Sequence, residues 1–341
     1  MENNDLIIIN NEKIFKENNS FYCKNLDLKV LTEGLNKYYK VQYIARHSSK
    51  KEKQKIFLKD IKESSNIFVF IKNILKTFKL SKANYLIISI TPYTFLSFLI
   101  LFLLRKKIFV YLFSSGHDEY KHILGRWSVW IYNIMYLIVT SGSTVIINHE
   151  RLSSKKNSHL INSSRLDKEW FEGHKKIDFE KVKVLYVGRI SSEKGILELM
   201  KILNEIKFDF SFSIAGNSAD DNIFSKNTKP LGYISESKKL IDTYDRHNIV
   251  ILPSYTEASP YVVDEALSRK RPIIIFEEID YIVRGKRGIF VSKRTADSLS
   301  ETIKYIVNNY LEIQKNIERN VLPTKDNMIK EISNIINIKK T

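Results

Sequence analysis

Cysteine is almost absent from this sequence. The chain has 341 residues and a single cysteine, Cys23, so no disulfide can form within it. A chain of this length without internal disulfides is typical of proteins from a reducing compartment. It is long enough for two domains that each bury a core of their own, and 43% of its residues are hydrophobic.

Several short motifs that define common enzyme classes are also missing. The sequence contains no G-x-G-x-x-G, no P-loop and no G-x-S-x-G, which argues against dehydrogenases, kinases and many hydrolases. Its seven histidines are scattered, and no D-x-D follows an expected strand. We therefore expect no metal site and no cofactor.

A secretory signal is not expected at the N-terminus. Residues Met1–Asp5 are polar and acidic, and Leu6–Ile9 is too short for the apolar core of a signal peptide. With the low cysteine content, this predicts a cytoplasmic protein.

Acidic residues are fewer than basic ones, and the imbalance lies in the first half. Residues 1–177 hold 29 Lys and Arg against 15 Asp and Glu, whereas residues 178–341 hold 26 against 23. A basic first half fits a nucleic acid, an anionic membrane surface or an anionic substrate as partner. The frequent Lys and Asn would equally follow from the codon usage of an AT-rich genome.

Apolar runs of strand length alternate with helix-length segments along the whole chain. Strands are predicted at 6–10, 41–45, 85–90, 108–113, 144–148, 182–187, 210–215, 249–252, 272–276 and 288–291. Helices are predicted at 25–38, 67–78, 91–104 and 127–139, after the first, third and fifth strands of the second half, and in the tail from 295. This alternation predicts an α/β protein with two doubly wound parallel sheets, and ligands at the carboxyl ends of their strands.

The polar segment 167–180 is the expected boundary region between the two domains. We predict a first domain over residues 1–170 and a second over 171–322. The remaining residues, 323–341, are predicted to form a C-terminal helix that packs back on the first domain.

Two apolar segments of the first half are open to three interpretations. Residues 85–104 carry no charge and have the length of a membrane span, but Pro92 and several polar residues favour a strand, a turn and a helix. A helix lying on a membrane face, with the basic cluster 105–107 at its end, is the second interpretation. Residues 127–139 are similarly apolar, and a buried core helix is the third interpretation for both segments.

The first chemical motif follows the strand 182–187. Gly188 permits a tight turn at the carboxyl end of this strand, and Arg189 and Lys194 place two cations beside it. Ser192 is predicted to cap a helix that starts at about Glu193. Two cations and a helix N-terminus can bind a diphosphate, although solvated loop charges are the simpler alternative.

The second motif is PSYTEASPYVVDEA at 253–266, where a strand ends and a helix begins. We expect Ser259 as N-cap and Pro260 as first helical residue, followed by Tyr261. The free N–H groups of this helix start can face a phosphate or sugar hydroxyls. Glu265, inside the helix, can accept both hydroxyls of a ribose, and Glu257, in the loop, can reach a sugar. Ordinary solvated carboxylates are the alternative.

Residues 182–292 resemble the donor domain of family 4 retaining glycosyltransferases, which have the GT-B fold. The resemblance rests on five segments in order: VGRISSEKG (187–195), LGYIS (231–235), PSYTEASPYVVDEAL (253–267), RPIII (271–275) and IVRGKRGIFV (282–291). It implies two Rossmann-like domains facing across a cleft, the first binding the acceptor and the second the nucleotide-sugar donor.

The resemblance also implies roles for individual residues of the second domain. Arg189 and Lys194 hold the diphosphate, Glu265 holds the ribose and Glu257 the donor sugar. The remaining predicted donor-binding residues line the same crevice or contact the base: Gly188, Gly216, Tyr233, Ile234, Ser259, Pro260 and Tyr261.

The sequence departs from the family pattern at two places. The usual E-G-F-[GP] is replaced by residues 257–260, EASP, which changes the pocket wall near the sugar. The first strand is followed by 10–13, NNEK, rather than by a glycine-rich loop. In the first domain, His117 or Asp118 is a candidate to face the donor sugar, and His149 is a weaker one.

The resemblance implies a metal-independent hexosyltransferase of polysaccharide biosynthesis, in which Arg and Lys neutralise the diphosphate. Its acceptor is expected to be a glycan or a lipid-linked precursor, and the enzyme is expected to lie peripherally on the inner face of the cell membrane. Nucleic acid is a less favoured partner. Two alternatives stay open: a GT-B-fold epimerase that acts on the nucleotide sugar itself, and an inactive relative that binds a membrane or nucleic acid.

Overall fold

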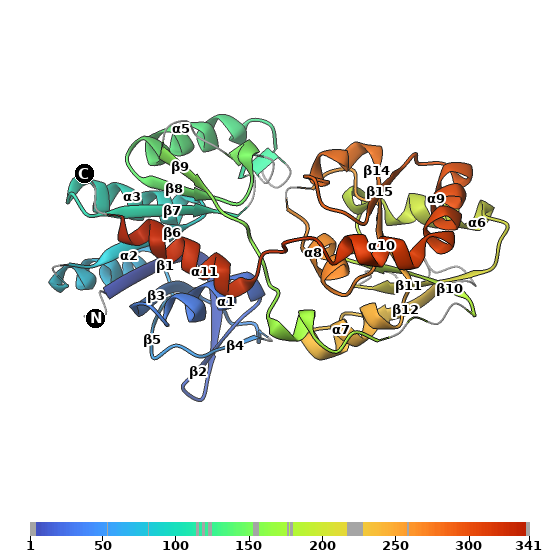
Figure 1. Ribbon diagram of the computed structural model, residues 1–341. Coiled ribbons are helices and arrows are strands. Elements are labelled where there is room, and N and C mark those ends of the chain that lie inside the picture. The colour runs from blue at the N-terminus through green and yellow to red at the C-terminus, as the bar shows by residue number, and fades with distance from the viewer. Residues whose placement is uncertain are drawn as a thin grey trace. The chain divides into compact units, whose positions relative to one another are not determined.

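The structure is a computed structural model of the chain, and it divides into two compact units (Figure 1). It describes residues 5–52, 54–80, 82–113, 116–117, 120–121, 125–152, 157–175, 177, 180–216, 228–257 and 259–338. Unit 1 consists of Met1–Arg165 and Lys325–Thr341, and unit 2 consists of Leu166–Thr324. The first boundary therefore falls upstream of the predicted residue 170, and the second falls just after the predicted residue 322.

Unit 1 is built on a nine-stranded sheet. Its strands are β1 (Asp5–Glu17), β2 (Ser20–Cys23), β3 (Lys40–His47), β4 (Gln54–Ile56), β5 (Asp60–Ser64), β6 (Asn84–Ile88), β7 (Ile108–Leu112), β8 (Thr144–Ile147) and β9 (Ser158–Leu160). Seven of them are parallel in the order β5-β3-β1-β6-β7-β8-β9, while β2 pairs antiparallel with β1 and β4 pairs antiparallel with β2. The parallel part is the doubly wound sheet expected from the sequence.

Near its start, the strand β1 has an unbroken run of apolar residues, because both of its faces are buried. Leu6 and Ile8 point into one core cluster of unit 1, and Ile7 and Ile9 point into the other. All four side chains are fully buried. A central strand of a parallel sheet is covered on both faces, so every position along it must be apolar.

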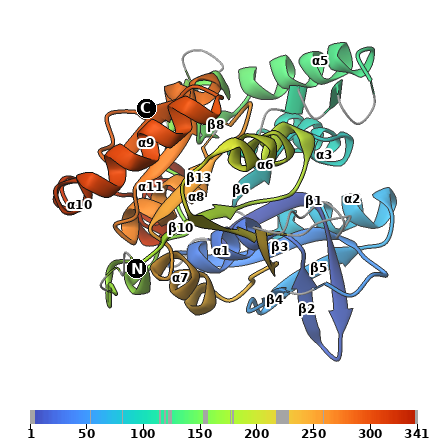
Figure 2. The ribbon, with the colours of Figure 1, turned by 90° about the vertical axis from the view of Figure 1, so that its right-hand side faces the viewer.

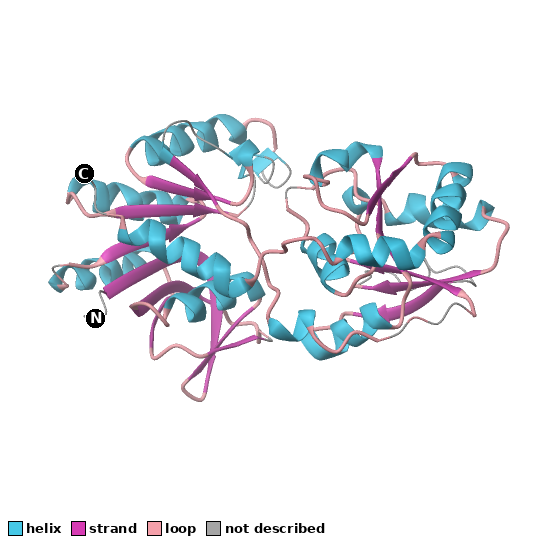
Figure 3. Cartoon of the chain, in the orientation of Figure 1, coloured by secondary structure: helices cyan, strands magenta, loops and turns pink. Residues whose placement is uncertain are grey.

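Helices cover both faces of this sheet (Figure 3). They are α1 (Leu26–Leu35), α2 (Ile67–Lys76), α3 (Pro92–Leu103), α5 (Ser128–Ser141) and α11 (Lys325–Asn337). The helices α1 and α11 pack on one core cluster, and α2, α3 and α5 pack on the other. The C-terminal helix α11 is held by the Tyr39 hydroxyl, which donates to the Ser333 carbonyl at 2.9 Å.

The prediction that the first strand ends at residue 10 is wrong. The strand β1 runs on to Glu17 through an irregularity in its pairing with β3 between Ile9 and Lys13. It then turns back into β2 at Asn18 and Asn19, which both have positive φ angles, of 45° and 62°. This matches the primed hairpin turns that suit the twist of two antiparallel strands.

The apolar run 85–104 is divided between two elements. Its first residues form β6, and Thr91 then begins α3 with a capping box shared with Thr94. Within the described residues, none of the helices has both the length and the apolar character that crossing a bilayer requires.

Unit 2 is built on a six-stranded parallel sheet in the order β12-β11-β10-β13-β14-β15. Its strands are β10 (Val182–Val187), β11 (Phe210–Ala215), β12 (Thr228–Gly232), β13 (Ile249–Leu252), β14 (Ile273–Phe276) and β15 (Ile289–Ser292). Its helices are α6 (Ile196–Glu205), α7 (Ser237–Asp245), α8 (Tyr261–Ser268), α9 (Ala296–Asn308) and α10 (Tyr310–Ile317). In chain order this is 3-2-1-4-5-6, the dinucleotide-binding arrangement.

A buried cluster of charges ties the elements of unit 2 together. Asp245 ends α7, and its carboxylate accepts from Arg269 at 3.0 and 2.7 Å. Arg269 is fully buried and also donates to the carbonyls of Trp170 and Glu172, in the segment before β10. Arg271, equally buried, donates to the Asp245 carbonyl at 3.0 Å. These bonds join α7, α8 and the beginning of the unit.

We predict that Asp245→Ala lowers the free energy of unfolding of unit 2 by about 3–5 kcal/mol, because it leaves two buried guanidinium groups without their counter-charge. The matched control is Asp242→Ala. Asp242 is 32% exposed and pairs with Lys175 and Arg246, so its loss should cost less than about 1 kcal/mol. Urea denaturation measures both values, and equal costs would contradict the assignment.

Candidate functional site

The candidate site lies at the carboxyl ends of the unit 2 strands. The strand order reverses between β10 and β13, since the chain moves outward in one direction from β10 and in the other from β13. In open α/β sheets, ligands bind outside the carboxyl ends at such a switch point. The loops that follow β10 and β13 carry the two motifs found in the sequence.

The loop after β10 is held by Tyr186. This side chain is fully buried, and its hydroxyl donates to the Arg189 carbonyl at 2.6 Å. Burial raises the pKa of Tyr186, so the hydroxyl keeps its proton and remains a donor. The prediction that Ser192 caps the next helix is wrong. Residues Ser192–Lys194 form a single 3-10 turn, and α6 begins only after Gly195, in the left-handed conformation with φ of 63°.

Gly195 brings the loops after β10 and β13 into contact. A Cβ atom at this position would lie 2.2 Å from the Pro253 carbonyl oxygen, so only glycine fits there. The Tyr255 N–H also donates to the Glu193 carbonyl at 3.0 Å. This close approach puts the residue before Gly195 within reach of the loop after β13.

Lys194 and Glu257 form an ion pair across this contact. The Lys194 Nζ lies 2.5 Å from Glu257 Oε1, and the two side chains are only 19% and 10% exposed. The same carboxylate oxygen accepts from the Ser254 hydroxyl at 2.7 Å. The Tyr281 hydroxyl accepts from the Glu257 N–H and donates to the Glu257 carbonyl. Both side chain and backbone of Glu257 are therefore fixed.

Arg189 is placed differently from Lys194. Its side chain is 79% exposed, and its nearest guanidinium nitrogen is 3.6 Å from Glu193. The Ser191 hydroxyl donates to that carboxylate at 2.7 Å, and this bond, with the nearby cations, lowers the pKa of Glu193. Arg189 is thus a loosely held cation that can move to an anion, whereas Lys194 is a fixed one.

The helix after β13 begins one residue later than predicted. The helix α8 starts at Tyr261, Pro260 occupies the N-cap position, and no side-chain hydrogen bond caps the helix there. The prediction of Ser259 as N-cap is therefore wrong.

Glu265, in the second turn of this helix, is 5% exposed. The Tyr244 hydroxyl donates to its Oε2 at 2.7 Å. Burial and the neighbouring Glu265 raise the pKa of Tyr244, which keeps this donor protonated. Tyr244 is a positioning residue that the sequence motifs do not reveal.

Three neighbouring strand ends carry glycine. Gly188 follows β10, Gly216 follows β11 and Gly232 ends β12. The Gly216 N–H donates to the Gly232 carbonyl at 2.9 Å, and a Cβ atom on Gly216 would lie 1.9 Å from the Gly188 carbonyl oxygen. Tyr233 follows directly and is 53% exposed, while Ile234 packs partly against the core of unit 2. The glycines therefore leave the backbone uncovered by side chains at this edge of the sheet, next to Tyr233 and Ile234.

Arg294 is a further cation of this region that the sequence analysis missed. Its guanidinium donates to the Pro253 carbonyl at 3.0 Å and to Glu278 at 2.8 Å. It also lies over the Tyr255 ring, 4.2 Å from the centroid. Its buried Nη1 has no hydrogen-bond partner in the part of the chain that the structure describes. In the sequence, the only indication that Arg294 belongs to the site is its position just after the strand β15.

Two of the three candidates of the first domain lie among the described residues of unit 1. His117 lies in unit 1 and its side chain is exposed. Asp118 lies outside the described residues. His149 is 5% exposed, just after β8. The roles of His117 and Asp118 therefore stay predictions.

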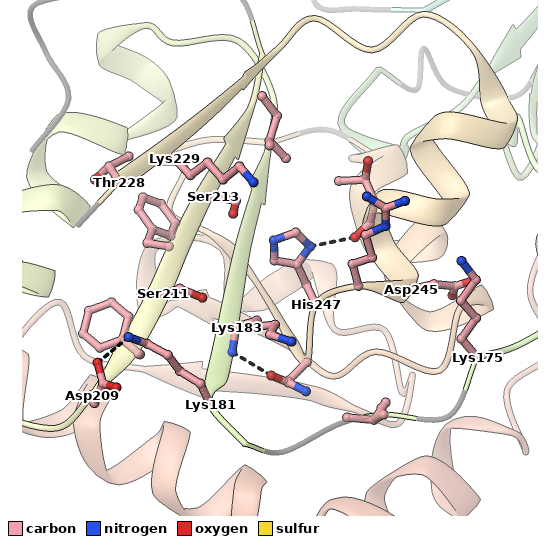
Figure 4. A pocket seen from close by; sticks show the side chains of 17 residues that line it. Lys175, Lys181, Lys183, Asp209, Ser211, Ser213, Thr228, Lys229, Asp245 and His247 are labelled. Carbon is pink, nitrogen blue, oxygen red and sulfur yellow. Dashed lines mark hydrogen bonds and ion pairs between the residues drawn. The ribbon is translucent and has the colours of Figure 1, made fainter. Parts of the chain in front are cut away.

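Two further features bear on the chemistry of the chain. Among the described residues, no group of three or more His, Cys, Asp or Glu side chains could hold a metal ion. A cavity of about 800 Å³ lies at the amino ends of β10, β11 and β12 (Figure 4). It is lined by residues such as Lys183, Lys229 and His247, and it includes none of the predicted donor-binding residues. The cavity is at the opposite edge of the sheet from the motifs.

Comparisons with known proteins point to one family. Residues 167–322 match the family described as Glycosyl transferases group 1. A capsular polysaccharide biosynthesis glycosyltransferase of Staphylococcus aureus is 28% identical over 137 residues, which are 36% of this chain and 36% of that protein. An N,N'-diacetylbacillosaminyl-diphospho-undecaprenol alpha-1,3-N-acetylgalactosaminyltransferase of Campylobacter jejuni is 24% identical over 172 residues, 48% of this chain and 46% of that protein. The chain thus spans less than half of each relative.

Solved structures resemble the whole chain. A sucrose-phosphate synthase from Thermosynechococcus elongatus superposes with a TM-score of 0.68 and 14% identity, covering 97% of this chain and 98% of that one. A lipopolysaccharide outer core galactosyltransferase superposes with a TM-score of 0.67 and 13% identity, covering 97% and 99%. At such low identity the likeness concerns the fold alone, and with the two parallel-sheet units it confirms the predicted GT-B fold.

We predict that Gly195→Ala destabilises unit 2 more than Gly285→Ala does. Both glycines have positive φ angles, 63° and 71°, but a Cβ atom meets backbone only at Gly195. The backbone strain at Gly285 should cost about 1–2 kcal/mol. The added clash at Gly195 should bring the total to about 3 kcal/mol or more. Chemical denaturation measures both, and equal losses would contradict the close approach of the two loops.

Proposed function

We propose, from the membership of residues 167–322 in the glycosyl transferases group 1 family, that this chain transfers a hexose from a nucleoside-diphosphate sugar to an acceptor hydroxyl. The observation that carries the proposal is the partly buried ion pair of Lys194 and Glu257 at the switch point between β10 and β13, with the exposed cation Arg189 in the same loop as Lys194. An acidic and a basic group fixed together at such a point suit a substrate with both a diphosphate and hydroxyl groups.

The donor is proposed to lie along the carboxyl edge of the unit 2 sheet. Its nucleoside would cross the glycine backbone at Gly216 toward Tyr233 and Ile234, because an edge without side chains lets a flat ring approach closely. Its ribose hydroxyls would donate to Glu265, which Tyr244 holds in place. The base contacts would be largely to backbone.

The diphosphate is proposed to lie between Arg189 and Lys194, with the start of α8 at Pro260 and Tyr261 facing it. Charge-assisted hydrogen bonds from Arg and Lys are well suited to phosphate oxygens. Two cations can neutralise the charge that develops on the leaving group, so the proposed reaction uses no metal ion and no cofactor. Glu257 would keep Lys194 in position and accept hydroxyls of the transferred sugar.

The proposed reaction breaks the bond between the anomeric carbon and the diphosphate oxygen. A bond between that carbon and the acceptor oxygen forms with retention of configuration, as the family resemblance implies. The proton of the acceptor hydroxyl leaves with the diphosphate. His117 and Asp118 are retained as candidates to contact the donor sugar from unit 1.

The acceptor is proposed to be a glycan or a lipid-linked glycan precursor at the cytoplasmic face of a membrane, in polysaccharide biosynthesis. Two relatives support this proposal through their names, since one acts in capsular polysaccharide biosynthesis and the other on a diphospho-undecaprenol compound. The excess of Lys and Arg in residues 1–177 also supports an acceptor at an anionic surface. Nucleic acid is not proposed as a partner.

We predict that Arg189→Ala weakens binding of a nucleoside diphosphate about tenfold to hundredfold, because a hydrogen bond to a charged group contributes about 1.5–3 kcal/mol. A panel of nucleoside diphosphates, monophosphates and nucleotide sugars identifies the ligand by thermal shift, and calorimetry then gives the affinity. The matched control is Lys201→Ala, an exposed cation of α6 that is paired with Glu198. Equal affinities in the two variants would place the diphosphate elsewhere.

We predict that Lys194→Met lowers the rate of sugar transfer about 100-fold or more, as loss of one donor to a developing negative charge does. Methionine keeps roughly the length and packing of the side chain and removes its charge and its N–H donors. Glu265→Gln should weaken donor binding, because glutamine can still accept from Tyr244 but carries no charge for the ribose hydroxyls.

Release of free nucleoside diphosphate in the presence of an acceptor measures the transfer. Circular dichroism and the melting temperature show whether each variant is folded. Full transfer by folded Lys194→Met would contradict the site. Conversion of the nucleotide sugar without release of diphosphate would instead identify an epimerase.

A further inference from the structure

One side of unit 1, at α3 and α5, exposes large hydrophobic side chains. Eight of them are at least 39% exposed, and we call this set the apolar face: Phe102, Leu103, Leu104, Trp127, Trp130, Ile134, Leu137 and Ile138. Leu103 reaches 78% and Leu137 reaches 65%. Single exposed apolar residues are common, but a group of this size marks an interaction site.

The helix α5 is apolar on both of its sides. Tyr132, Met135 and Val139 face the core of unit 1 and are buried. The opposite side carries four members of the apolar face, Trp127 precedes the helix as its N-cap residue, and the 14 residues of α5 include no charged residue. A surface helix in water normally has a polar outer side. The apolar outer side of α5 is therefore suited to contact with another apolar surface rather than with water.

The two helices contribute to one continuous surface. Gly142 follows α5, and a Cβ atom there would lie 2.7 Å from the Phe102 ring and 2.8 Å from the Phe98 ring. The rings of Phe98 and Phe102 stack with their centroids 5.5 Å apart. Figure 2 shows α3 and α5 as neighbours on the same side of unit 1.

Among the described residues, the segments that form the apolar face carry only positive charges. Residues 82–117 and 120–149 contain no Asp or Glu. Arg105, just after α3, and Arg126, just before α5, are exposed. Lys106 lies over the Phe78 ring, 5.3 Å from its centroid. Among the described residues of these two ranges the charges are therefore all positive, and a hydrophobic surface bordered by cations is complementary to an apolar layer covered by anions.

We propose that the apolar face docks this protein on an anionic lipid bilayer. The helix α5 lies flat in the interface, because its 14 residues span about 21 Å and a bilayer core is about 30 Å thick. Trp127 and Trp130 sit at headgroup level, where indole rings are enriched. Arg105 and Arg126 contact lipid phosphates.

A second copy of this chain is a poorer occupant of the same surface. A two-fold contact would place the same patch on both partners, so the cations of one border, Arg105 and Arg126, would meet the same cations of the other. The docking also gives the proposed function a place to act, since a lipid-linked acceptor is held at the same surface. It rests on the proposed function for that purpose only.

We expect the purified full-length protein to sediment with vesicles of equimolar phosphatidylglycerol and phosphatidylcholine, and to bind vesicles of phosphatidylcholine alone at least about tenfold more weakly. Raising the salt concentration should weaken binding to the anionic vesicles. Trp130→Ser with Leu137→Ser should reduce that binding at least about tenfold, because both side chains are then too polar to enter the interface.

The matched control is Tyr305→Ser with Leu311→Ser in unit 2. These side chains are 57% and 73% exposed, against 59% and 65% for Trp130 and Leu137, and their loss should leave vesicle binding unchanged. No sedimentation of the wild type, or equal binding by both double variants, would overturn the inference. So would a wild-type dimer, in the absence of lipid, that only the first double variant abolishes. Binding is measured without any nucleotide sugar, so its failure leaves the test of sugar transfer intact.

Discussion

The carboxylate of Asp245, buried between Arg269 and Arg271, is the interaction on which unit 2 depends. Isolated buried charges are very costly, so three of them persist only because each is bonded to another or to backbone carbonyls. The consequence reaches the candidate site, because α7 ends with Tyr244 and Asp245 together. Asp245 joins α7, α8 and the beginning of the unit, and the neighbouring Tyr244 holds Glu265.

The candidate donor site is assembled from backbone as much as from side chains. Gly216 and Gly195 let neighbouring loops meet at distances that any Cβ atom would forbid. The contact at Gly195 brings Lys194 close to Glu257. Arg294 stabilises the loop after β13 in this contact by donating a hydrogen bond to the Pro253 carbonyl. A cation fixed in this way loses little conformational entropy when it binds an anion, whereas the exposed Arg189 side chain is held more loosely, by a 3.6 Å contact with Glu193.

The surfaces of the two units suit different parts of the proposed function, which are donor binding for unit 2 and membrane docking for unit 1. Unit 2 is close to charge balance and carries the bonded carboxylates and cations at its strand ends. Unit 1 holds most of the basic excess and the apolar face formed by α3 and α5. On an anionic lipid surface, the basic residues of unit 1 are attracted over distances of up to a Debye length. The apolar face adds to this attraction at contact, where its side chains are buried.

The sequence by itself determined the α/β class, the two parallel sheets and the loops that carry Arg189, Lys194 and Glu257, because buried parallel strands read as apolar runs and a strand end is set by local composition. It missed β2, β4, β5, β9 and β12, which are short or only partly buried, and it wrongly placed helix caps at Ser192 and Ser259. Only the tertiary structure decided that Lys194 pairs with Glu257, that Tyr244 holds Glu265 and that Arg294 supports the loops. Those contacts join residues far apart in the chain, and their geometry follows from sheet order rather than from local pattern.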